Sequence, residues 1–189
     1  MILNEQKIAM FESFILNTDE KATASQIAKK NNLNQKSVYL FMEELGRDGI
    51  LTSEIQGKNR LYQLNKYNKE LVKQFICSVE HLRTVYFYQK NPDIKLIIQK
   101  LLPHIDGMTA IFGSYAKNTQ KGTSDLDIFI MGNYDEKEID LISATFSINI
   151  NIKHYTSFKE DTLTKEIKKN HILIKNTEQF VREANQWIN

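Results

Sequence analysis

Cysteine is nearly absent from this chain of 189 residues, which contains a single one, Cys77. One cysteine can form neither an internal disulfide framework nor the ligand set of a zinc ribbon, and we expect Cys77 to be a small buried apolar residue. Long apolar runs are absent as well, since no stretch approaches the roughly 20 residues of a membrane-spanning helix. The first residues predict an amphipathic helix rather than a signal peptide. These absences predict a cytoplasmic protein without a membrane partner.

The chain has little excess charge of either sign, with 25 Lys and Arg against 23 Asp and Glu and a formal net charge of +2. This net charge alone gives no argument for nucleic-acid binding. Hydrophobic residues at 41% and charged residues at 25% are typical of a globular protein. No internal repeat or low-complexity segment is present. The length accommodates one large or two small domains.

The segment IFGSYAKNTQKGTSDLDIFIM, residues 111–131, contains the strongest chemical signal. It predicts a strand over residues 109–112, a Gly-Ser turn that opens a short helix, a polar loop and a second strand over residues 126–131. Asp125 and Asp127 are two residues apart, so in an extended segment both carboxylates project to the same face. Such a pair suits Mg²⁺, which is usually held by one or two carboxylates together with substrate phosphates.

The residues upstream of this pair suit a phosphate group. Gly113 lets backbone approach a ligand closely, and Ser114 adds a hydroxyl where the amides of a starting helix point outward. A triphosphate would fit between the Gly-Ser turn and the two aspartates.

This segment resembles the signature of the DNA polymerase beta-like nucleotidyltransferase superfamily, with the compact spacing of its minimal nucleotidyltransferase branch. In that branch the segment often reads G-S-[YR]-A-[RK]-G, five further residues, and S-D-[ILV]-D. Asn118 stands at the usual glycine, and Asn tolerates the left-handed conformation. The matching residues are Gly113, Ser114, Tyr115, Ala116, Lys117, Ser124, Asp125, Leu126 and Asp127.

The resemblance implies a transferase that uses Mg²⁺ or Mn²⁺ to move a nucleoside monophosphate from a nucleoside triphosphate, ATP in the first instance, to a hydroxyl. It implies that Asp125 and Asp127 bind the metal and are catalytic together with Ser114. The implied nucleotide-binding residues are Gly113, Ser114, Lys117 and Ser124. The acceptor stays open between a protein tyrosine or serine, as in antitoxins that nucleotidylate a partner toxin, a nucleic-acid end and a small hydroxylated compound. We rank a protein acceptor first because the chain is small.

A third acidic residue is missing where the family normally places one. Residues 135–143 predict a helix, and residues 144–155 alternate as a strand, on which the family's third acid would stand. Asn149 and Asn151 occupy the outward face instead. Asparagine can offer an oxygen to a metal but cannot accept a proton as a base. Either catalysis is weakened or lost, or another acid such as Glu160 or Asp161 enters from the following loop.

Residues 1–66 predict helices over 4–16, 23–30 and 35–48 and a hairpin over 50–64. This order, and the segment SQIAKKNNLNQKSVYLFMEELGRDGIL, resemble the winged helix-turn-helix domain. The resemblance implies that the third helix enters a major groove and that the wing contacts phosphates. The implied DNA-binding residues are Asn34, Gln35, Lys36, Ser37 and Tyr39 on the helix, and Lys58 and Arg60 on the wing.

The charge of this part is nearly balanced, with nine Lys and Arg against eight Asp and Glu over residues 1–66. Leu40 also stands where many DNA-binding members have a basic residue. The alternative is therefore a winged helix used for dimerisation or partner docking.

Residues 67–90 predict a long linking helix, and residues 91–189 a nucleotidyltransferase-like domain with a mixed sheet, giving an α+β fold. The aromatic cluster over residues 86–88 is expected to pack against this domain or against a second subunit of a homodimer. The expected apolar stripe of the linking helix is Leu71, Phe75, Val79, Leu82, Val85 and Tyr86. The second domain is expected to contain a helix over residues 93–102 with Leu96, Ile97, Leu101 and Leu102 facing the core, a helix over 157–170, a strand over 172–174 and a helix over 177–187 docked by Trp187.

Three functions remain open from the sequence. The first is a nucleotidyltransferase coupled to a DNA-binding winged helix. The second is a DNA-binding regulator whose transferase-like domain binds nucleotide as a sensor, without turnover. The third is an inactive antitoxin or scaffold that docks a partner protein.

Overall fold

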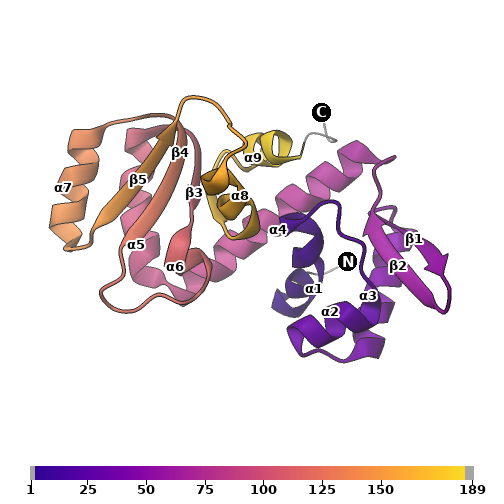
Figure 1. Cartoon of the computed structure of the whole chain (residues 1–189). Helices are drawn as coiled ribbons and strands as arrows, with labels where there is room; N and C mark the ends of the chain where they lie inside the picture. The colour runs from indigo at the N-terminus through magenta and orange to yellow at the C-terminus, as the bar shows by residue number, and fades with distance from the viewer. Residues whose placement is uncertain (1–2, 186–189) are drawn as a thin grey trace. The chain divides into compact units, whose positions relative to one another are not determined.

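The computed structural model of the chain describes residues 3–185 (Figure 1). It divides into two compact units. Residues up to Val79, with Asn185, belong to the first unit, and Glu80–Ala184 form the second. Within residues 3–185 no helix combines the length and apolar character needed to cross a membrane.

The first unit contains three helices followed by an antiparallel hairpin, in the order that the sequence predicts. A single bridge between Ala22 and Tyr62 adds the loop before the second helix to the edge of the hairpin. The assignment of this unit as a winged helix-turn-helix domain stays a prediction. Its elements are α1 (Glu5–Leu16), α2 (Ala24–Asn31), α3 (Gln35–Arg47), β1 (Leu51–Gln56), β2 (Asn59–Leu64) and the start of α4 (Lys69–Lys90).

Side-chain caps fix where these helices begin. The Thr23 side chain accepts from the Gln26 amide and the Gln26 side chain accepts from the Thr23 amide, which confirms the predicted capping box of α2. Asn32 ends α2 in the left-handed conformation at φ 52°. The expected core face of α3 is also confirmed, because all four of its residues are buried: Val38, Phe41, Met42 and Leu45.

The predicted apolar stripe of α4 is wrong in part. Leu71 and Val85 are exposed, whereas Glu80 and Arg83 are buried with the apolar residues of the inner face. Cys77 is buried, as expected. The stripe was misplaced because a buried acid and arginine on one face read in the sequence as a solvent-exposed face.

The second unit is built on a four-stranded sheet in the order β5-β4-β3-β6. The β4 and β5 strands are parallel, and the other two pairs are antiparallel, so the sheet is mixed, as predicted. After α4 the elements are α5 (Pro92–Leu101), a 3-10 turn (Leu102–His104), β3 (Ile105–Ile111), α6 (Gly113–Ala116), β4 (Leu126–Tyr134), α7 (Glu136–Phe146), β5 (Ile150–Tyr155), α8 (Thr162–Lys169), β6 (Ile172–Lys175) and α9 (Thr177–Ala184).

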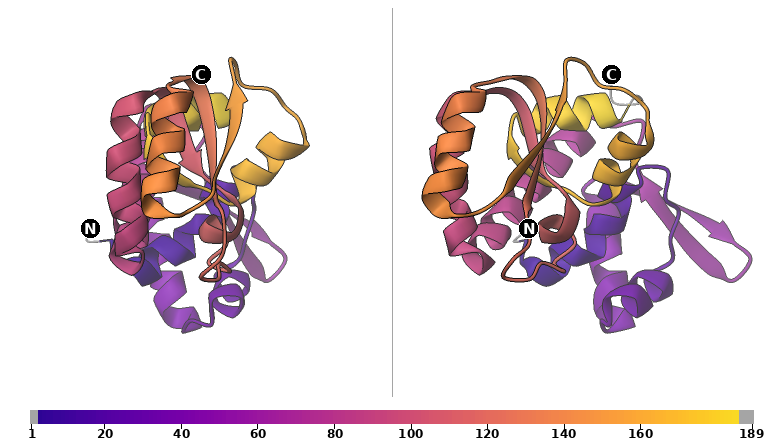
Figure 2. Two further views of the ribbon diagram at one scale, coloured as in Figure 1. Left: turned by 90° about the vertical axis from the view of Figure 1, so that its left-hand side faces the viewer. Right: turned by 60° about the vertical axis from the view of Figure 1, so that its left-hand side comes forward.

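Helices cover both faces of this sheet (Figure 2). On one face α5 and α7 lie side by side and bury a cluster that includes Ile98, Leu101, Ile128 and Ile130. On the other face, Ile167 of α8 and Phe180 of α9 pack on alternate residues of the same strands. Alternation along β4 thus buries the side chains of both of its faces in a core. Polar side chains are exposed only at the ends of the strand.

Several predicted boundaries differ from the structure. The helix before β5 continues through Phe146 and ends at Ser147 in the left-handed conformation, so the alternating stretch from residue 144 becomes a strand only at Ile150. Leu96 of α5 is exposed, and Ile94 and Ile98 are buried in its place. The helix predicted over residues 157–170 begins at Thr162. Trp187 lies outside the described residues.

Candidate active site

The Gly-Ser turn lies against the first residues of β4. The Phe112 amide donates to the Asp127 carbonyl at 3.0 Å, which brings α6 against that aspartate. Gly113 has φ +68°, a conformation that residues with a side chain rarely adopt. A Cβ on Gly113 would also lie 2.1 Å from Oδ2 of Asp127. Glycine is therefore required here by both backbone conformation and contact with the carboxylate.

Asn151 joins the two aspartates. The parallel register pairs Asp127 of β4 with Asn151 of β5. The Asn151 Nδ2 donates to Oδ2 of Asp125 at 3.2 Å and to Oδ1 of Asp127 at 3.3 Å. Oxygens of two different carboxylates thus converge on one small polar group at the end of the sheet. Asp125 is exposed and Asp127 half-buried, so the group is open to solvent.

The other candidates for a third ligand or base are placed elsewhere. Asn149 is exposed and precedes β5, and its carbonyl accepts from the Leu126 amide. The Asp161 side chain caps α8 at the Thr164 amide. A hydrogen bond from the Tyr155 hydroxyl is the main cause that lowers the pKa of Asp161. Glu160 is paired with Lys168. In this structure the Glu160 and Asp161 side chains therefore have partners other than the two site aspartates.

Lys117, at the end of α6, forms an ion pair that the sequence did not predict. Its Nζ lies 2.6 Å from Oε1 of Glu166, and both side chains are partly exposed. Glu166 lies on α8, which covers the face of the sheet opposite to α5 and α7. Nothing in the local sequence marks Glu166, since it is one of several charged residues on an amphipathic helix. A lysine expected to meet phosphate thus already has an anionic partner.

The loop between α6 and β4 is held by its own side chains. Asn118 adopts φ 55°, which agrees with the expectation that asparagine can replace the usual glycine there. The Ser124 hydroxyl accepts from the Lys121 amide at 2.8 Å and retains a proton to donate. The Ser114 carbonyl accepts from the Thr119 amide at 2.9 Å. Ser114 and Ser124 keep their assignment as nucleotide-binding residues as a prediction.

The residues present fit a single divalent cation. Two carboxylates provide hard oxygen atoms. The side-chain amide of Asn151, which contacts both carboxylates through its nitrogen, also has a neutral oxygen that can bind a cation. Within the part of the chain that the structure describes, no group of three or more His, Cys, Asp or Glu residues could hold a metal. The fit is therefore to a site of two acids and an amide, completed by oxygens from a ligand.

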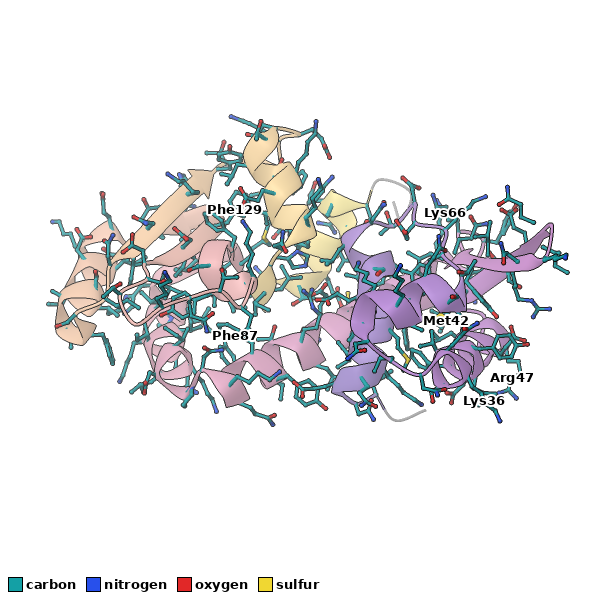
Figure 3. The ribbon with its side chains drawn as sticks, turned by 60° about the horizontal axis from the view of Figure 1, so that its bottom comes forward. Lys36, Met42, Arg47, Lys66, Phe87 and Phe129 are labelled. Carbon is teal, nitrogen blue, oxygen red and sulfur yellow. The ribbon has the colours of Figure 1, made fainter. Side chains whose placement is uncertain are left out.

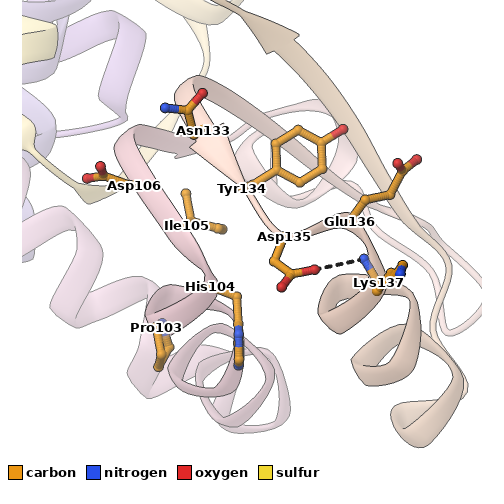
Figure 4. A pocket seen from close by; sticks show the side chains of 9 residues that line it. All are labelled: Pro103, His104, Ile105, Asp106, Asn133, Tyr134, Asp135, Glu136 and Lys137. Atoms are coloured by element: carbon orange, nitrogen blue, oxygen red, sulfur yellow. Dashed lines mark hydrogen bonds between the residues drawn. The ribbon is translucent and has the colours of Figure 1, made fainter.

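A separate open pocket of about 750 Å³ lies at the opposite end of β4 (Figure 4). It is lined by two segments, residues 103–106 and residues 133–137. The Asp135 carboxylate in it accepts from the Lys137 amide and caps α7. Seven residues of strand, roughly 23 Å, separate Tyr134 at this pocket from Asp127. The pocket therefore takes no part in the site.

Of the residues implied to bind DNA, some have exposed side chains and others already bind a partner within the first unit. Gln35, Lys36, Ser37 and Tyr39 are exposed on α3, and Lys36 lies at the surface of the first unit in Figure 3. Lys58 is exposed in the hairpin turn. The residues with a partner are Asn34, whose Oδ1 caps α3, and Arg60, whose guanidinium lies 2.8 Å from Glu43.

A buried ionic cluster in the second unit was missed by the sequence reasoning. Arg83 donates to both carboxylate oxygens of Glu80 at 2.8 Å, and His171 Nε2 lies 3.1 Å from Oε1 of Glu80. Burial alone raises the pKa of Glu80, but the charge of Arg83 and the interaction with His171 outweigh it and lower that pKa to about 2. The cluster fixes the segment between α8 and β6 to α4.

The chain is similar in sequence to part of a known protein. A protein of Methanocaldococcus jannaschii named "Putative protein adenylyltransferase MJ0435" is 40% identical over 52 residues. The match covers 28% of this chain and 56% of that protein, so the chain spans about half the length of this relative.

A solved structure described as TrmBL2, an archaeal chromatin protein with a novel mode of DNA binding, aligns over 99% of this chain and 91% of its own. Its identity is 11% and its TM-score 0.30, which is too low to support a conclusion.

The model of the family described as "Nucleotidyltransferase domain" matches residues 92–186, half of the chain. The matched range contains the Gly-Ser turn, both aspartates and every strand of the mixed sheet. The chain belongs to the nucleotidyltransferase domain family.

Proposed function

We propose that the protein transfers a nucleoside monophosphate from a Mg²⁺-bound nucleoside triphosphate to a hydroxyl group of a protein. The observation that carries this proposal is the convergence of Asp125 and Asp127 oxygens on one point beside the Gly113 turn. A family assignment alone would be compatible with a degenerate site. Here both acids are present and bound by the same Asn151 amide, and Asp127 lies against Gly113.

Each residue of the site has a separate role in this proposal. Asp125 and Asp127 hold the cation, which when bound offsets the negative charge of the triphosphate and of the leaving pyrophosphate. Ser114 and the amides at the start of α6 bind the β- and γ-phosphates. Lys117 is drawn from Glu166 toward the pyrophosphate as negative charge develops there.

The chemistry is a displacement at the α-phosphorus. The acceptor oxygen forms a bond to this phosphorus while the bond to the oxygen that bridges the α- and β-phosphates breaks. Pyrophosphate leaves, and the acceptor proton passes to solvent water, which reaches the site beside the exposed Asp125. Asn151 cannot take that proton, because an amide is not a base at neutral pH.

A protein acceptor and ATP are supported by the relative that is named as a protein adenylyltransferase. A tyrosine or serine hydroxyl of a partner, such as a toxin, would meet the chemical requirement. The exposure of Asp125 at the end of the sheet is compatible with an acceptor as large as a protein. A nucleic-acid end and a small hydroxylated compound are the alternatives that the assay below must distinguish.

The first unit serves in this proposal as a winged helix that binds DNA through α3 and the hairpin turn. Exposed Gln35, Lys36, Ser37 and Tyr39 at the leading end of α3 support it. The unit would then place the transferase at a DNA site. Dimerisation or partner docking through the same unit remains the competing use.

A second function is favoured by one observation, the amide of Asn151 at the place of a third acid. In this alternative the protein is a DNA-binding regulator or antitoxin that binds nucleotide without turnover. It predicts nucleotide-dependent DNA binding and no release of pyrophosphate.

The test uses ATP labelled at the α- or the γ-phosphorus, incubated with the full chain, Mg²⁺ and soluble protein from the source cell. Nucleotidyl transfer predicts that only the α-label becomes attached to protein, and that a protease but not a nuclease removes it. Transfer of the γ-label would indicate phosphoryl transfer instead. Nucleotide binding without transfer of either label would favour the sensor.

A further inference from the structure

Asn151 is the only residue whose side chain is recorded as hydrogen-bonded to both site aspartates within residues 3–185. Its Nδ2 lies 3.2 Å from Asp125 Oδ2 and 3.3 Å from Asp127 Oδ1. Its neighbour in the register is Asp127, so the strand pairing and not a flexible loop sets its position. Asn151 is also half-buried. These features make it a fixed part of the site.

The two ends of this amide have opposite polarity, and the nitrogen end faces the two carboxylates. Two carboxylates repel an acceptor oxygen and attract N–H donors, so the Asn151 nitrogen faces them. Once the same oxygens hold a cation, the preference reverses, because a cation attracts the amide oxygen. Asn151 must then turn its amide by half a rotation or move aside before the cation is fully bound.

The charge of the site has a second consequence. Cation affinity depends on the number of charged ligands, and here two carboxylates face a neutral amide. Before the cation enters, it must also displace the two hydrogen bonds of Asn151. A triphosphate contributes several anionic oxygens. These offset both the missing third charge and the loss of the two Asn151 hydrogen bonds.

We infer that Asn151 makes the cation site dependent on the triphosphate, so that the free protein binds a divalent cation weakly and the metal enters with the nucleotide. This inference rests on the proposed function and adds an order of binding to it. A carboxylate at the same position would remove the dependence, because it would supply charge without a donor to displace.

The test uses Mn²⁺ as the probe and measures free Mn²⁺ by electron paramagnetic resonance. The full chain is titrated alone and with α,β-methylene ATP, which cannot be cleaved between its α- and β-phosphates. The analogue should increase the affinity of the wild-type chain for Mn²⁺ on the order of tenfold beyond what the analogue binds by itself. Asn151→Asp should bind Mn²⁺ without the analogue on the order of tenfold more tightly than wild type.

Asn149→Asp is the matched control, since it adds the same charge two residues earlier. Asn149 is exposed, and its side chain has no recorded bond to either site aspartate. This control should bind Mn²⁺ as wild type does. Thermal unfolding provides a second readout: Asn151→Asp should unfold at a lower temperature than wild type in a chelator, and should gain more from Mn²⁺.

The outcomes separate the inference from the proposed function. Tight binding of Mn²⁺ to the wild-type chain without nucleotide, equal to that of Asn151→Asp, would overturn the inference and leave the transferase proposal intact. An equal effect of Asn149→Asp would also overturn it, because position would then not matter. Absence of Mn²⁺ binding in the wild-type chain with the analogue would contradict both.

Discussion

Gly113 and Asp127 are in such close contact that a Cβ on the glycine would lie 2.1 Å from the carboxylate oxygen. The turn and the strand that carry them are separated by a polar loop, yet the Phe112 amide bonds the Asp127 carbonyl. The Gly-Ser turn and the Asp-x-Asp pair are therefore one physical unit. A change in either half must disturb the other.

Gly113→Ala tests this unit. The alanine must adopt φ +68° and displace the Asp127 carboxylate, which shifts a metal ligand. We expect transfer activity to fall on the order of a hundredfold, as misplacement by about 1 Å can do, with a loss of about 1 to 3 kcal/mol in unfolding free energy. Gly122→Ala, in the loop between α6 and β4, is the control, since its Cβ would meet nothing within 4 Å. Equal activity of the two variants would contradict the assignment.

Glu166→Gln tests whether Lys117 serves phosphate. The change releases the Lys117 ammonium from its partner and removes a negative charge, so triphosphate affinity should rise about threefold to tenfold. Unfolding free energy should change by less than about 1 kcal/mol, because the pair is exposed. Isothermal calorimetry with Mg-ATP measures the first, and urea denaturation the second.

The controls for this prediction are Lys117→Met and Glu136→Gln. The first should lower triphosphate affinity, and with Glu166→Gln in the same chain the gain should disappear. Glu136 is exposed at the start of α7, at the other end of β4, and should have no effect. If Glu166→Gln weakened triphosphate binding, Lys117 would have another role.

Glu80→Gln tests the buried ionic cluster. The pKa of Glu80 is lowered from 4.5 to about 2 in the folded chain. Its contribution to stability is thus present above pH 4.5 and is lost as the pH falls through about 2. We expect Glu80→Gln to lower the unfolding free energy at pH 7 by about 3 kcal/mol, and this difference from wild type to shrink between pH 4.5 and pH 2.

Glu70→Gln on the same helix is the control for this effect. Glu70 is exposed and paired with Lys73, so its loss should change stability far less than the loss of Glu80 does. Chemical denaturation at several pH values measures all three proteins. A constant difference between wild type and Glu80→Gln at every pH would show that Glu80 does not titrate as described.

DNA binding by the first unit predicts a defined loss on neutralising an exposed lysine. Lys58→Ala should weaken binding to all sequences and reduce the slope of log affinity against log salt by about 0.9, the value for one phosphate contact. Lys95→Ala, an exposed lysine of the second unit, is the control. Fluorescence anisotropy with duplex DNA measures the slope. No binding of the wild-type chain at low salt would exclude this use of the unit.

Local signals in the sequence predicted much of the fold and of the site. The capping box at Thr23 and the left-handed Asn118 were predictable because each depends on a few neighbouring residues. The Gly113 to Asp127 motif was predictable because its spacing is short. The α7 end was misplaced, because Phe146 and Ile148 continue the alternation of β5 across a left-handed Ser147.

Contacts between distant residues could not be read from the sequence. Asn151 reaches Asp125 only because β4 and β5 are parallel and in one particular register. Glu80 and His171 are 91 residues apart, and a glutamate on a helix suggests solvent exposure until the partner is known. Glu166 was missed for the same reason. Such pairs depend on the packing of whole elements.

Calorimetric titration of Mg-ATP into the full chain, and into the isosteric variant Asp125→Asn with Asp127→Asn, tests the central claim most directly. The account predicts Mg²⁺-dependent binding to the wild-type chain, because the two carboxylates hold the cation that the triphosphate completes. It predicts that the variant loses this dependence while keeping its fold by circular dichroism. Equal Mg²⁺-dependent binding by both proteins would contradict the assignment of Asp125 and Asp127 as the metal site.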